Sequence, residues 1–314
     1  MNSITIFLVF FGSLSALNDY ATANSKCAAA ISAYPPGPET GCCGVESAET
    51  KILGGNRTEI DQFPWLAQIE YLKEDKLKVI CGATLIGGKF LLTAAHCVSG
   101  PIIKTFIPKN IILGEYDTSH EGPDCVPALG GGEDCTDGAI RIPIEKIIIH
   151  PQYEDNSKLR RNDIALIKMT ELAPFTDFIR PICLPTSDIT LTKDPIKWLK
   201  FAAWGTASGP SPVKLHVGLP FVPQEKCQLA YSSNGRDITL WKGQLCAGGE
   251  KDKDSCKGDG GLPLMNDNGG RYEVVGLVSF GSTPCGTENI PSVFTNVYEY
   301  KYWIMSSASA AEQT

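Results

Sequence analysis

Residues 254–264 read Asp-Ser-Cys-Lys-Gly-Asp-Gly-Gly-Leu-Pro-Leu, and this segment is the most informative part of the chain. Glycine and aspartate alternate around a cysteine, which is typical of a tight turn before an apolar strand. Because glycine has no side chain, Gly260 at the centre of the turn offers no hydroxyl for covalent catalysis.

Three motifs lie upstream of this turn. Residues 51–55 read Lys-Ile-Leu-Gly-Gly, residues 92–98 read Leu-Thr-Ala-Ala-His-Cys-Val, and residues 162–166 read Asn-Asp-Ile-Ala-Leu. Taken singly, a lone histidine is more often a structural residue than a general base, and an acid before an apolar run is usually a turn or strand-end residue. Their order along one chain is what carries information.

Short β-branched and aromatic runs, at residues 147–149, 164–167, 274–278 and 293–297, are separated by Gly, Pro, Asn and Asp. This pattern predicts an all-β fold of sandwich or barrel type. Helical spacing of Val297, Tyr300, Trp303 and Ile304 predicts one packing helix near the end, before a polar tail at residues 306–314.

The 314 residues are 43% hydrophobic, which is enough for a sizeable core. The net charge is -7 with both signs interspersed, so the chain lacks the basic footprint of a nucleic-acid-binding protein. An apolar stretch at residues 4–17, followed by Ala-Thr-Ala at 21–23, predicts a signal peptide over residues 1–23. No later run approaches the roughly 20 residues of a membrane helix. We therefore expect a secreted protein without a membrane anchor.

An even count of twelve cysteines in an exported chain indicates disulfides, although spacing alone leaves the pairing open. There is no Cys-x-x-Cys motif, and the histidines (His96, His120, His150 and His216) are scattered, so no metal site is expected. Residues 56–58 read Asn-Arg-Thr, which makes Asn56 a candidate glycosylation site.

Together the four motifs resemble those of the chymotrypsin-like serine proteases, over residues 52–305. The resemblance implies two six-stranded antiparallel β-barrels with a C-terminal helix and a site between the barrels. Residues 24–51 would form a short cysteine-containing light chain or pro-segment.

The resemblance assigns catalytic roles to the motif residues. His96 would be the general base, Asp163 would hold its tautomer, and Gly260 stands at the nucleophile position. The backbone N–H groups of Gly258 and Gly260 would form the oxyanion site. Without a hydroxyl, a loss of about a millionfold in turnover is expected. Ser255 is not expected to reach His96 and replace it.

The resemblance also assigns a specificity pocket. Asp254 matches the carboxylate that selects Arg or Lys, while Ser279, Gly281 and Ser292 match the pocket walls. Trypsin-like members usually carry glycine where this chain has Ser292. We expect the Ser292 side chain to narrow the pocket.

An activation step is implied as well. Cleavage after Lys51 by a trypsin-like protease would free the amino group of Ile52, which would pair with Asp259. Keeping both ends of a buried ion pair indicates that the cleaved form is used. Inheritance without use is the alternative.

Leu262 is a second departure from the usual Gly-Asp-Ser-Gly-Gly-Pro motif. If position 262 needs a glycine-only backbone geometry, leucine would strain the turn. On that basis Gly260→Ser alone would restore little activity, and adding Leu262→Gly would restore more.

The resemblance implies the disulfide pairs Cys81–Cys97, Cys227–Cys246 and Cys256–Cys285, with Cys125–Cys135 bridging an insertion. Cys183 would tether the light chain through Cys42 or Cys43, and Cys27 would take the remaining thiol.

The insertion and residues 114–118 resemble the arthropod clip-domain proteases of clotting and prophenoloxidase cascades. A full clip module has six cysteines, but only Cys27, Cys42 and Cys43 precede Lys51, so the clip is truncated or absent. Glu115 and Asp117 could belong to a calcium loop, although solvated loop acids are the favoured interpretation.

The sequence thus favours a secreted, non-catalytic protease homologue that regulates a haemolymph immune cascade of the melanisation type. Its partners would be other secreted proteases or prophenoloxidase-type proteins, and a trypsin-like protease would activate it. The alternatives are an active trypsin-like endopeptidase made as a zymogen, and a venom-type inactive homologue that competes for partners.

Overall fold

The computed structural model describes Cys27 and residues 31–46, 58–128, 131–192, 196, 198–205, 211–235 and 238–313. The predicted signal peptide, Lys51, Ile52 and Asn56 lie outside the described residues.

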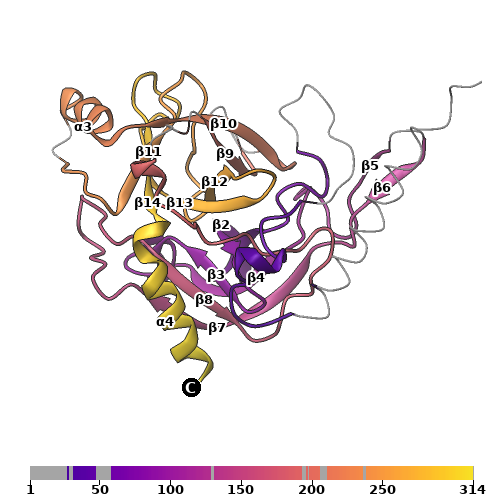
Figure 1. Ribbon diagram of the computed structural model, residues 1–314. Coiled ribbons are helices and arrows are strands. Elements are labelled where there is room, and N and C mark those ends of the chain that lie inside the picture. Colours follow the sequence, from indigo (N-terminus) through magenta and orange to yellow (C-terminus); the bar gives the residue numbers. More distant parts are fainter. Residues whose placement is uncertain are drawn as a thin grey trace, which may run out of the picture.

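The first half of the described chain forms a closed six-stranded antiparallel barrel with strand order β1-β2-β3-β8-β7-β4 (Figure 1). Its strands are β1 (Leu66–Lys73), β2 (Lys76–Leu85), β3 (Phe90–Thr93), β4 (Ile107–Leu113), β7 (Ile140–Ile149) and β8 (Ala165–Met169). Strands β3 and β8 are buried throughout, because they cross the middle of the molecule.

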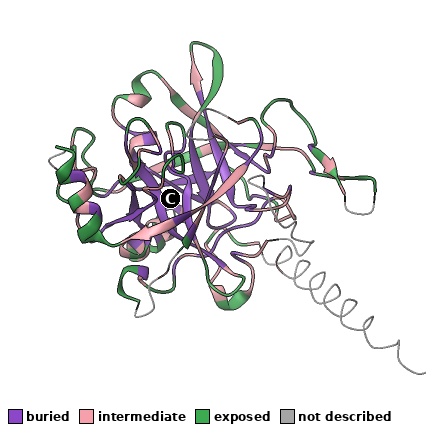
Figure 2. Ribbon diagram, turned by 90° about the horizontal axis from the view of Figure 1, so that it is seen from above, coloured by how far each residue is buried: buried purple, intermediate pink, exposed green. Residues whose placement is uncertain are grey.

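The second half forms another closed six-stranded antiparallel barrel, with order β10-β11-β14-β13-β12-β9. Its strands are β9 (Trp198–Ala203), β10 (Leu215–Val222), β11 (Gln244–Ala247), β12 (Pro263–Asp267), β13 (Tyr272–Phe280) and β14 (Ser292–Asn296). The strands hold most of the buried residues, and the connecting loops are largely exposed (Figure 2). The two-barrel fold implied by the motifs is therefore confirmed.

Aromatic side chains join the two barrels. Trp65, just before β1, packs against Tyr272 of β13 with 5.4 Å between ring centroids, and Phe63 packs edge-on against the same tyrosine at 5.6 Å. All three side chains are almost completely buried. Burial of rings this large contributes strongly to a stable relative position of the barrels.

Helices are few among the described residues. The α-helices are α2 (Ala95–Val98), α3 (Gln224–Ser233) and α4 (Lys301–Glu312), and the 3-10 helices are η1 (Pro38–Thr40), η2 (Ile102–Lys104), η3 (Ile189–Leu191) and η4 (Val297–Tyr300). The predicted C-terminal helix is confirmed as α4, which lies along the first barrel (Figure 1). It extends through residues 306–312, which the sequence placed in a tail, because Lys168 of β8 donates to the carbonyl of Ala311 at 3.0 Å and pairs with Glu312 at 3.3 Å. None of the helices in the described ranges is long and apolar enough to cross a membrane.

All twelve cysteines form disulfides: Cys27–Cys42, Cys43–Cys183, Cys81–Cys97, Cys125–Cys135, Cys227–Cys246 and Cys256–Cys285. Every pair implied by the resemblance is present, and the open choice for Cys183 falls on Cys43. The backbone explains that choice: Gly44 donates to the carbonyl of Pro181 at 2.8 Å and accepts from Tyr272 at 2.7 Å. These bonds place Cys43 beside Cys183.

The insertion carrying Cys125 and Cys135 is an antiparallel hairpin of β5 (Cys125–Pro127) and β6 (Glu133–Cys135). It projects from the body of the protein (Figure 1). The disulfide joins the first and last residues of the hairpin, which restrains a segment that has little core of its own.

Candidate functional site

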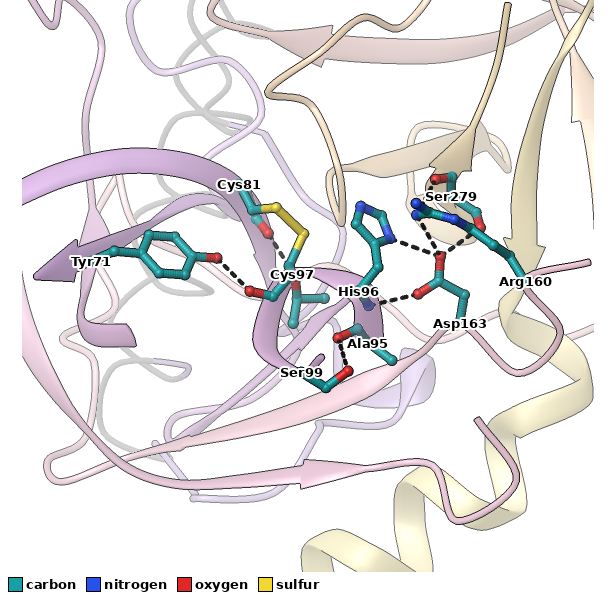
Figure 3. Close-up of a disulfide and its surroundings, with 11 residues drawn as sticks. Tyr71, Cys81, Ala95, His96, Cys97, Ser99, Arg160, Asp163 and Ser279 are labelled. Carbon is teal, nitrogen blue, oxygen red and sulfur yellow. Dashed lines mark hydrogen bonds and ion pairs between the residues drawn. A yellow bond between two sulfur atoms is a disulfide. The ribbon is translucent and has the colours of Figure 1, made fainter. Parts of the chain in front are cut away.

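His96 and Asp163 come together at the edge of the first barrel (Figure 3). His96 lies in the single turn of α2 that follows β3, and Asp163 lies two residues before β8, which pairs with β3. The Nδ1 atom of His96 is 2.8 Å from Oδ2 of Asp163, and the backbone N–H of His96 donates to Oδ1 at 2.9 Å. The second ring nitrogen, Nε2, is thereby directed away from Asp163, toward the second barrel.

Asp163 is fully buried, and its charge is held by several donors. The hydroxyl of Ser279 donates to Oδ2 at 2.6 Å, alongside His96. Burial acts to raise the pKa of Asp163, but the charge and hydrogen bonds of His96, together with the Ser279 bond, outweigh it and hold the pKa below its ordinary value. Asp163 is therefore an ionised carboxylate that can orient the imidazole and stabilise its protonated form.

Gly260 faces the imidazole from the second barrel. A β-carbon added at Gly260 would lie 2.7 Å from Nε2 of His96 and 3.0 Å from Sγ of Cys97. The structure thus brings together the three motif residues at the positions that the sequence assigned to base, acid and nucleophile. The imidazole stands so close to Gly260 that a side chain there would displace it.

The turn that carries Gly260 is shaped by its neighbours. Gly258 and Gly261 have φ of 108° and 81°, in the left-handed region that favours glycine. The carbonyl of Gly260 accepts from the N–H of Gly82 in β2 at 2.9 Å, which ties the turn to the first barrel. Within the described residues, the N–H groups of Gly258 and Gly260 have no protein acceptor, so they are free to donate to a ligand oxygen.

Leu262 is accommodated without backbone strain. It is absent from the residues with positive φ and is 2% exposed, as part of the main hydrophobic core. Its side chain fills the space over Gly82, where an added β-carbon would lie 2.3 Å from the Cδ2 atom of Leu262. The glycine-only geometry considered for position 262 belongs instead to Gly261.

The carboxylate of Asp254, expected at the base of the specificity pocket, is hydrogen-bonded within the protein. The hydroxyl of Ser292 donates to Oδ1 of Asp254 at 2.5 Å, and the N–H groups of Ser255 and Gly286 donate to its carboxylate at 2.8 and 3.0 Å. A β-carbon at Gly281 would lie 2.4 Å from Oγ of Ser292, so these two walls meet. Ser292 therefore narrows the pocket and occupies the carboxylate that a basic side chain would need.

Burial raises the pKa of Asp254 above its ordinary value, although the hydrogen bonds from Ser292 and the backbone oppose this. Ser255 contributes its hydroxyl to Ser292 at 3.2 Å. Ser255 is thus engaged at the base of the pocket and is not hydrogen-bonded to His96.

Asp259 is buried, and its Oδ2 accepts from the N–H of Cys256 at 2.7 Å. No cation among the described residues forms an ion pair with it; Ile52, its expected partner, lies outside them. Burial raises the pKa of Asp259 to about 6. The carboxylate is poised to gain from a positively charged partner.

The sequence placed Ser279 in the pocket wall, and the structure shows that its hydroxyl donates a hydrogen bond to Asp163. The assignment from sequence missed Arg160 altogether. The guanidinium of Arg160 donates from Nη1 to the carbonyl of Ser279 at 3.3 Å, and the same atom is 3.9 Å from Oδ2 of Asp163 (Figure 3). The signal that could have drawn attention to Arg160 is the basic run Lys-Leu-Arg-Arg at residues 158–161, directly before the Asp163 motif.

Two groups of metal-capable side chains converge in the described part of the chain: Cys81, His96 and Cys97, and Cys125, Glu133 and Cys135. In both groups the cysteines form a disulfide, so they offer no thiolate.

The acids considered for calcium accept hydrogen bonds from neighbouring backbone N–H groups. Oε1 of Glu115 accepts from the N–H of Tyr116 at 3.0 Å, and Asp117 accepts from the N–H of Ser119 at 3.0 Å. Asp124 accepts from the N–H of Asp117 at 3.0 Å and lies 3.2 Å from Nε2 of His120. Burial, and then repulsion by Asp124, raises the pKa of Glu115. These acids are not among the groups of metal-capable side chains that converge in the described part of the chain.

Comparison with known proteins agrees with this geometry. The family described as Trypsin matches residues 52–304. The phenoloxidase-activating enzyme of Bombyx mori is 49% identical over 291 residues, which cover 90% of this chain and 66% of the relative. Melanization protease 1 of Drosophila melanogaster is 38% identical over 280 residues, which cover 85% and 68%.

Among solved structures, the Drosophila Grass clip serine protease of the Toll pathway superimposes with a TM-score of 0.72 at 31% identity, covering 85% of this chain and 74% of that one. The chain thus spans about two thirds of the length of the curated relatives it matches. With two closed barrels, a His96–Asp163 pair at their junction and a family match over residues 52–304, the chain belongs to the trypsin family.

Proposed function

We propose that this protein is a secreted, non-catalytic serine protease homologue that acts by binding, as a cofactor or regulator in an extracellular protease cascade. The observation that carries the proposal is Gly260, which faces Nε2 of His96 without a hydroxyl. Peptide hydrolysis by this family needs a nucleophile within hydrogen-bond reach of its base. Among the described residues, no hydroxyl is hydrogen-bonded to His96.

The residues around the missing hydroxyl are retained, which supports a binding function over the general loss of a former active site. His96 and Asp163 keep their hydrogen bonds, and Asp259 keeps the buried position in which it would receive the Ile52 amino group after cleavage at Lys51. A buried carboxylate without a partner destabilises a fold. Its retention supports a role for the cleaved conformation.

The kind of cascade is drawn from the relatives. Two of them are named a phenoloxidase-activating enzyme and a melanization protease. This supports a place in an insect immune cascade of the melanisation type, with other secreted proteases or prophenoloxidase-type proteins as partners. A trypsin-like protease that cuts after Lys51 would act upstream.

An active trypsin-like endopeptidase is the competing function, and the intact His96–Asp163 pair together with the 49% identity to a relative named as an enzyme favours it. It requires a nucleophile other than residue 260. It also requires that basic side chains enter the pocket past Ser292, which the bond to Asp254 opposes.

The test uses the secreted chain, purified intact and after cleavage at Lys51. Neither form should react with a fluorophosphonate probe or hydrolyse Arg or Lys peptide substrates. In a reconstituted prophenoloxidase-activation reaction containing an active cascade protease, adding the homologue should change the rate of phenoloxidase formation. Turnover by the wild type that disappears in His96→Ala would overturn the proposal.

A further inference from the structure

The segment that carries Arg160 is clamped on both sides. The amide of Gln244 donates to the carbonyl of Leu159 at 2.9 Å, and the guanidinium of Arg161 lies 5.7 Å from the ring centroid of Trp241. Arg160 itself has a φ of 43°, in the left-handed region. A bulky residue holds that conformation only where its surroundings enforce it, and such residues gather at functional sites.

Asn162, two residues later, completes the clamp. Its Oδ1 accepts from the hydroxyl of Tyr300 at 3.1 Å, and its Nδ2 donates to the carbonyl of Gln152 at 2.9 Å. The position of Arg160 is therefore set by contacts to η4, to the 241–244 segment and to the start of its own loop. These contacts hold the backbone from which the Arg160 side chain extends.

The guanidinium of Arg160 lies beside the His96–Asp163 pair, and among the described residues only its Nη1 atom forms a hydrogen bond or an ion pair. It contacts the carbonyl of Ser279, and its distance of 3.9 Å to Asp163 is long for an ion pair. Asp163 already receives bonds from His96 and Ser279 (Figure 3). The Arg160 side chain is 37% exposed, so guanidinium donors remain open to a ligand.

Other cations share this part of the surface. Lys158 and Arg161 flank Arg160, and Lys257 precedes the Gly258–Gly261 turn; all three are exposed. Glu154 and Asp155 lie earlier in the same loop, and Oδ1 of Asp155 accepts from the hydroxyl of Ser99 at 2.6 Å. The acids nearest to His96 and Gly260, which are Asp163 and Asp259, are buried, whereas Lys158, Arg161 and Lys257 are exposed and outnumber the exposed acids Glu154 and Asp155.

The carboxylate that would attract a basic ligand is meanwhile closed. Ser292 and two backbone N–H groups occupy Asp254, and Ser292 meets Gly281 across the pocket. A family member with an open Asp254 selects Lys or Arg side chains. In this chain the partly exposed charged group beside the His96–Asp163 pair is instead the guanidinium of Arg160.

We propose that the surface between Arg160 and Gly260 binds an extended acidic segment of a partner protein, with an Asp or Glu carboxylate paired to the guanidinium of Arg160. The inference rests on the proposed function only in that the bound segment is not cleaved. The planar guanidinium presents parallel N–H donors that match a carboxylate, and such charge-assisted pairs are stronger than neutral hydrogen bonds. The free N–H groups of Gly258 and Gly260 add donors for a backbone carbonyl of the same segment.

Fluorescence anisotropy with labelled hexapeptides tests this. The probes are Gly-Ser-Glu-Glu-Ser-Gly and its Gln-Gln and Lys-Lys analogues, each titrated with the Lys51-cleaved protein at low salt. The glutamate peptide should bind tightest and the lysine peptide weakest. Arg160→Gln should weaken binding of the glutamate peptide by about tenfold, as expected when one charge-assisted pair is lost. Lys76→Gln, which neutralises an exposed lysine at the start of β2, is the matched control and should change affinity by less than about twofold.

Because Arg160 also contacts Ser279, Arg160→Gln could alter the fold, so a charge reversal is included. Arg160→Glu should reverse the preference and favour the lysine peptide, an outcome that unfolding cannot produce. The proposal is overturned if the glutamate and glutamine peptides bind the wild type equally, or if neither Arg160 variant changes their ranking. Cleavage of a bound probe would overturn the non-catalytic function while leaving the role of Arg160 in place.

Discussion

The imidazole of His96 faces Gly260 so closely that a β-carbon at position 260 would lie 2.7 Å from Nε2. Contacts under about 3 Å to a β-carbon force one partner to move. The ring occupies part of the space that a side chain at residue 260 would need, while its Nδ1 remains bonded to Asp163. A returning serine therefore has to push the imidazole outward.

Restoring the nucleophile should restore covalent labelling without restoring hydrolysis of Arg substrates. Gly260→Ser in the Lys51-cleaved protein should react with a fluorophosphonate probe. The imidazole has to move slightly to admit the serine side chain, and its hydrogen bond to Asp163 keeps it oriented as a general base. Hydrolysis of Arg peptides should stay near background, because Ser292 still occupies Asp254. Labelling gels and a chromogenic Arg substrate measure the two properties.

Gly260→Ser/His96→Ala is the control and should not label. The structure also changes the expectation for Leu262: because its side chain is buried in the core, Leu262→Gly should lower stability and add no labelling. A gain in labelling from Leu262→Gly would contradict this.

Opening the pocket should create a binding site for a cation. Ser292→Gly removes the hydroxyl from Asp254 and the contact with Gly281, so benzamidine should raise the melting temperature of this variant but not of the wild type. Differential scanning fluorimetry measures the shift.

The double variant Ser292→Gly/Asp254→Asn removes the carboxylate and should lose the response. A wild type that is stabilised by benzamidine to the same extent would show that Ser292 does not close the pocket.

Asp259 should make the uncleaved protein less stable at pH 6 and above than at pH 4. Its pKa is raised from 3.8 to about 6, so the folded state holds the proton more tightly than the unfolded chain. The free energy of unfolding therefore falls as the pH rises from about 4 to about 6 and is level above that. Asp259→Asn should raise it at pH 7 by about 3 kcal/mol and should have little effect at pH 4.

Urea unfolding of intact and Lys51-cleaved protein at both pH values checks the prediction. If the Ile52 amino group pairs with Asp259 after cleavage, the sign should reverse and Asp259→Asn should destabilise the cleaved form at pH 7. Equal effects of the substitution at pH 4 and pH 7 in the intact protein would be inconsistent with the raised pKa.

Gly82 and Leu262 should be energetically coupled. Gly82→Ala places a β-carbon 2.3 Å from Cδ2 of Leu262 and should lower the free energy of unfolding by about 1–3 kcal/mol. Leu262→Ala alone should lower it by about 2–5 kcal/mol through the cavity that it leaves. In the double variant the new methyl group occupies part of that cavity, so the combined loss should be smaller than the sum.

A double-mutant cycle by chemical denaturation measures this coupling. The control pair is Gly82→Ala with Ser306→Ala, which alters an exposed serine of α4 and should be additive. Additive losses for Gly82 and Leu262 would mean that the two residues do not share the space.

Much of the fold could be predicted from the sequence. The runs at residues 147–149, 164–167, 274–278 and 293–297 fall within or across β7, β8, β13 and β14, because β-branched and aromatic residues suit a buried strand. Closure into two barrels of six strands came from the motif resemblance, since alternation in single strands does not specify how a sheet closes.

The candidate site was predictable only in part. His96, Asp163 and Gly260 were identified because the chemistry requires those residue types, or makes their loss visible, within short motifs. Arg160 was missed because nothing in the run at residues 158–161 shows which side chain will turn toward the site. The strain expected at Leu262 was absent because Gly261 takes the left-handed conformation and Gly82 leaves room for the leucine side chain.

The sequence by itself determined the family, the presence of an even set of cysteines and the absence of a hydroxyl at residue 260. These properties belong to residue identities within short segments, and they need no knowledge of distant contacts. The tertiary structure alone decided that Cys43 pairs with Cys183, that Ser292 closes over Asp254 and that Arg160 reaches Ser279. Each of these depends on residues far apart in the chain, which meet only because the packing of two closed barrels fixes their separation.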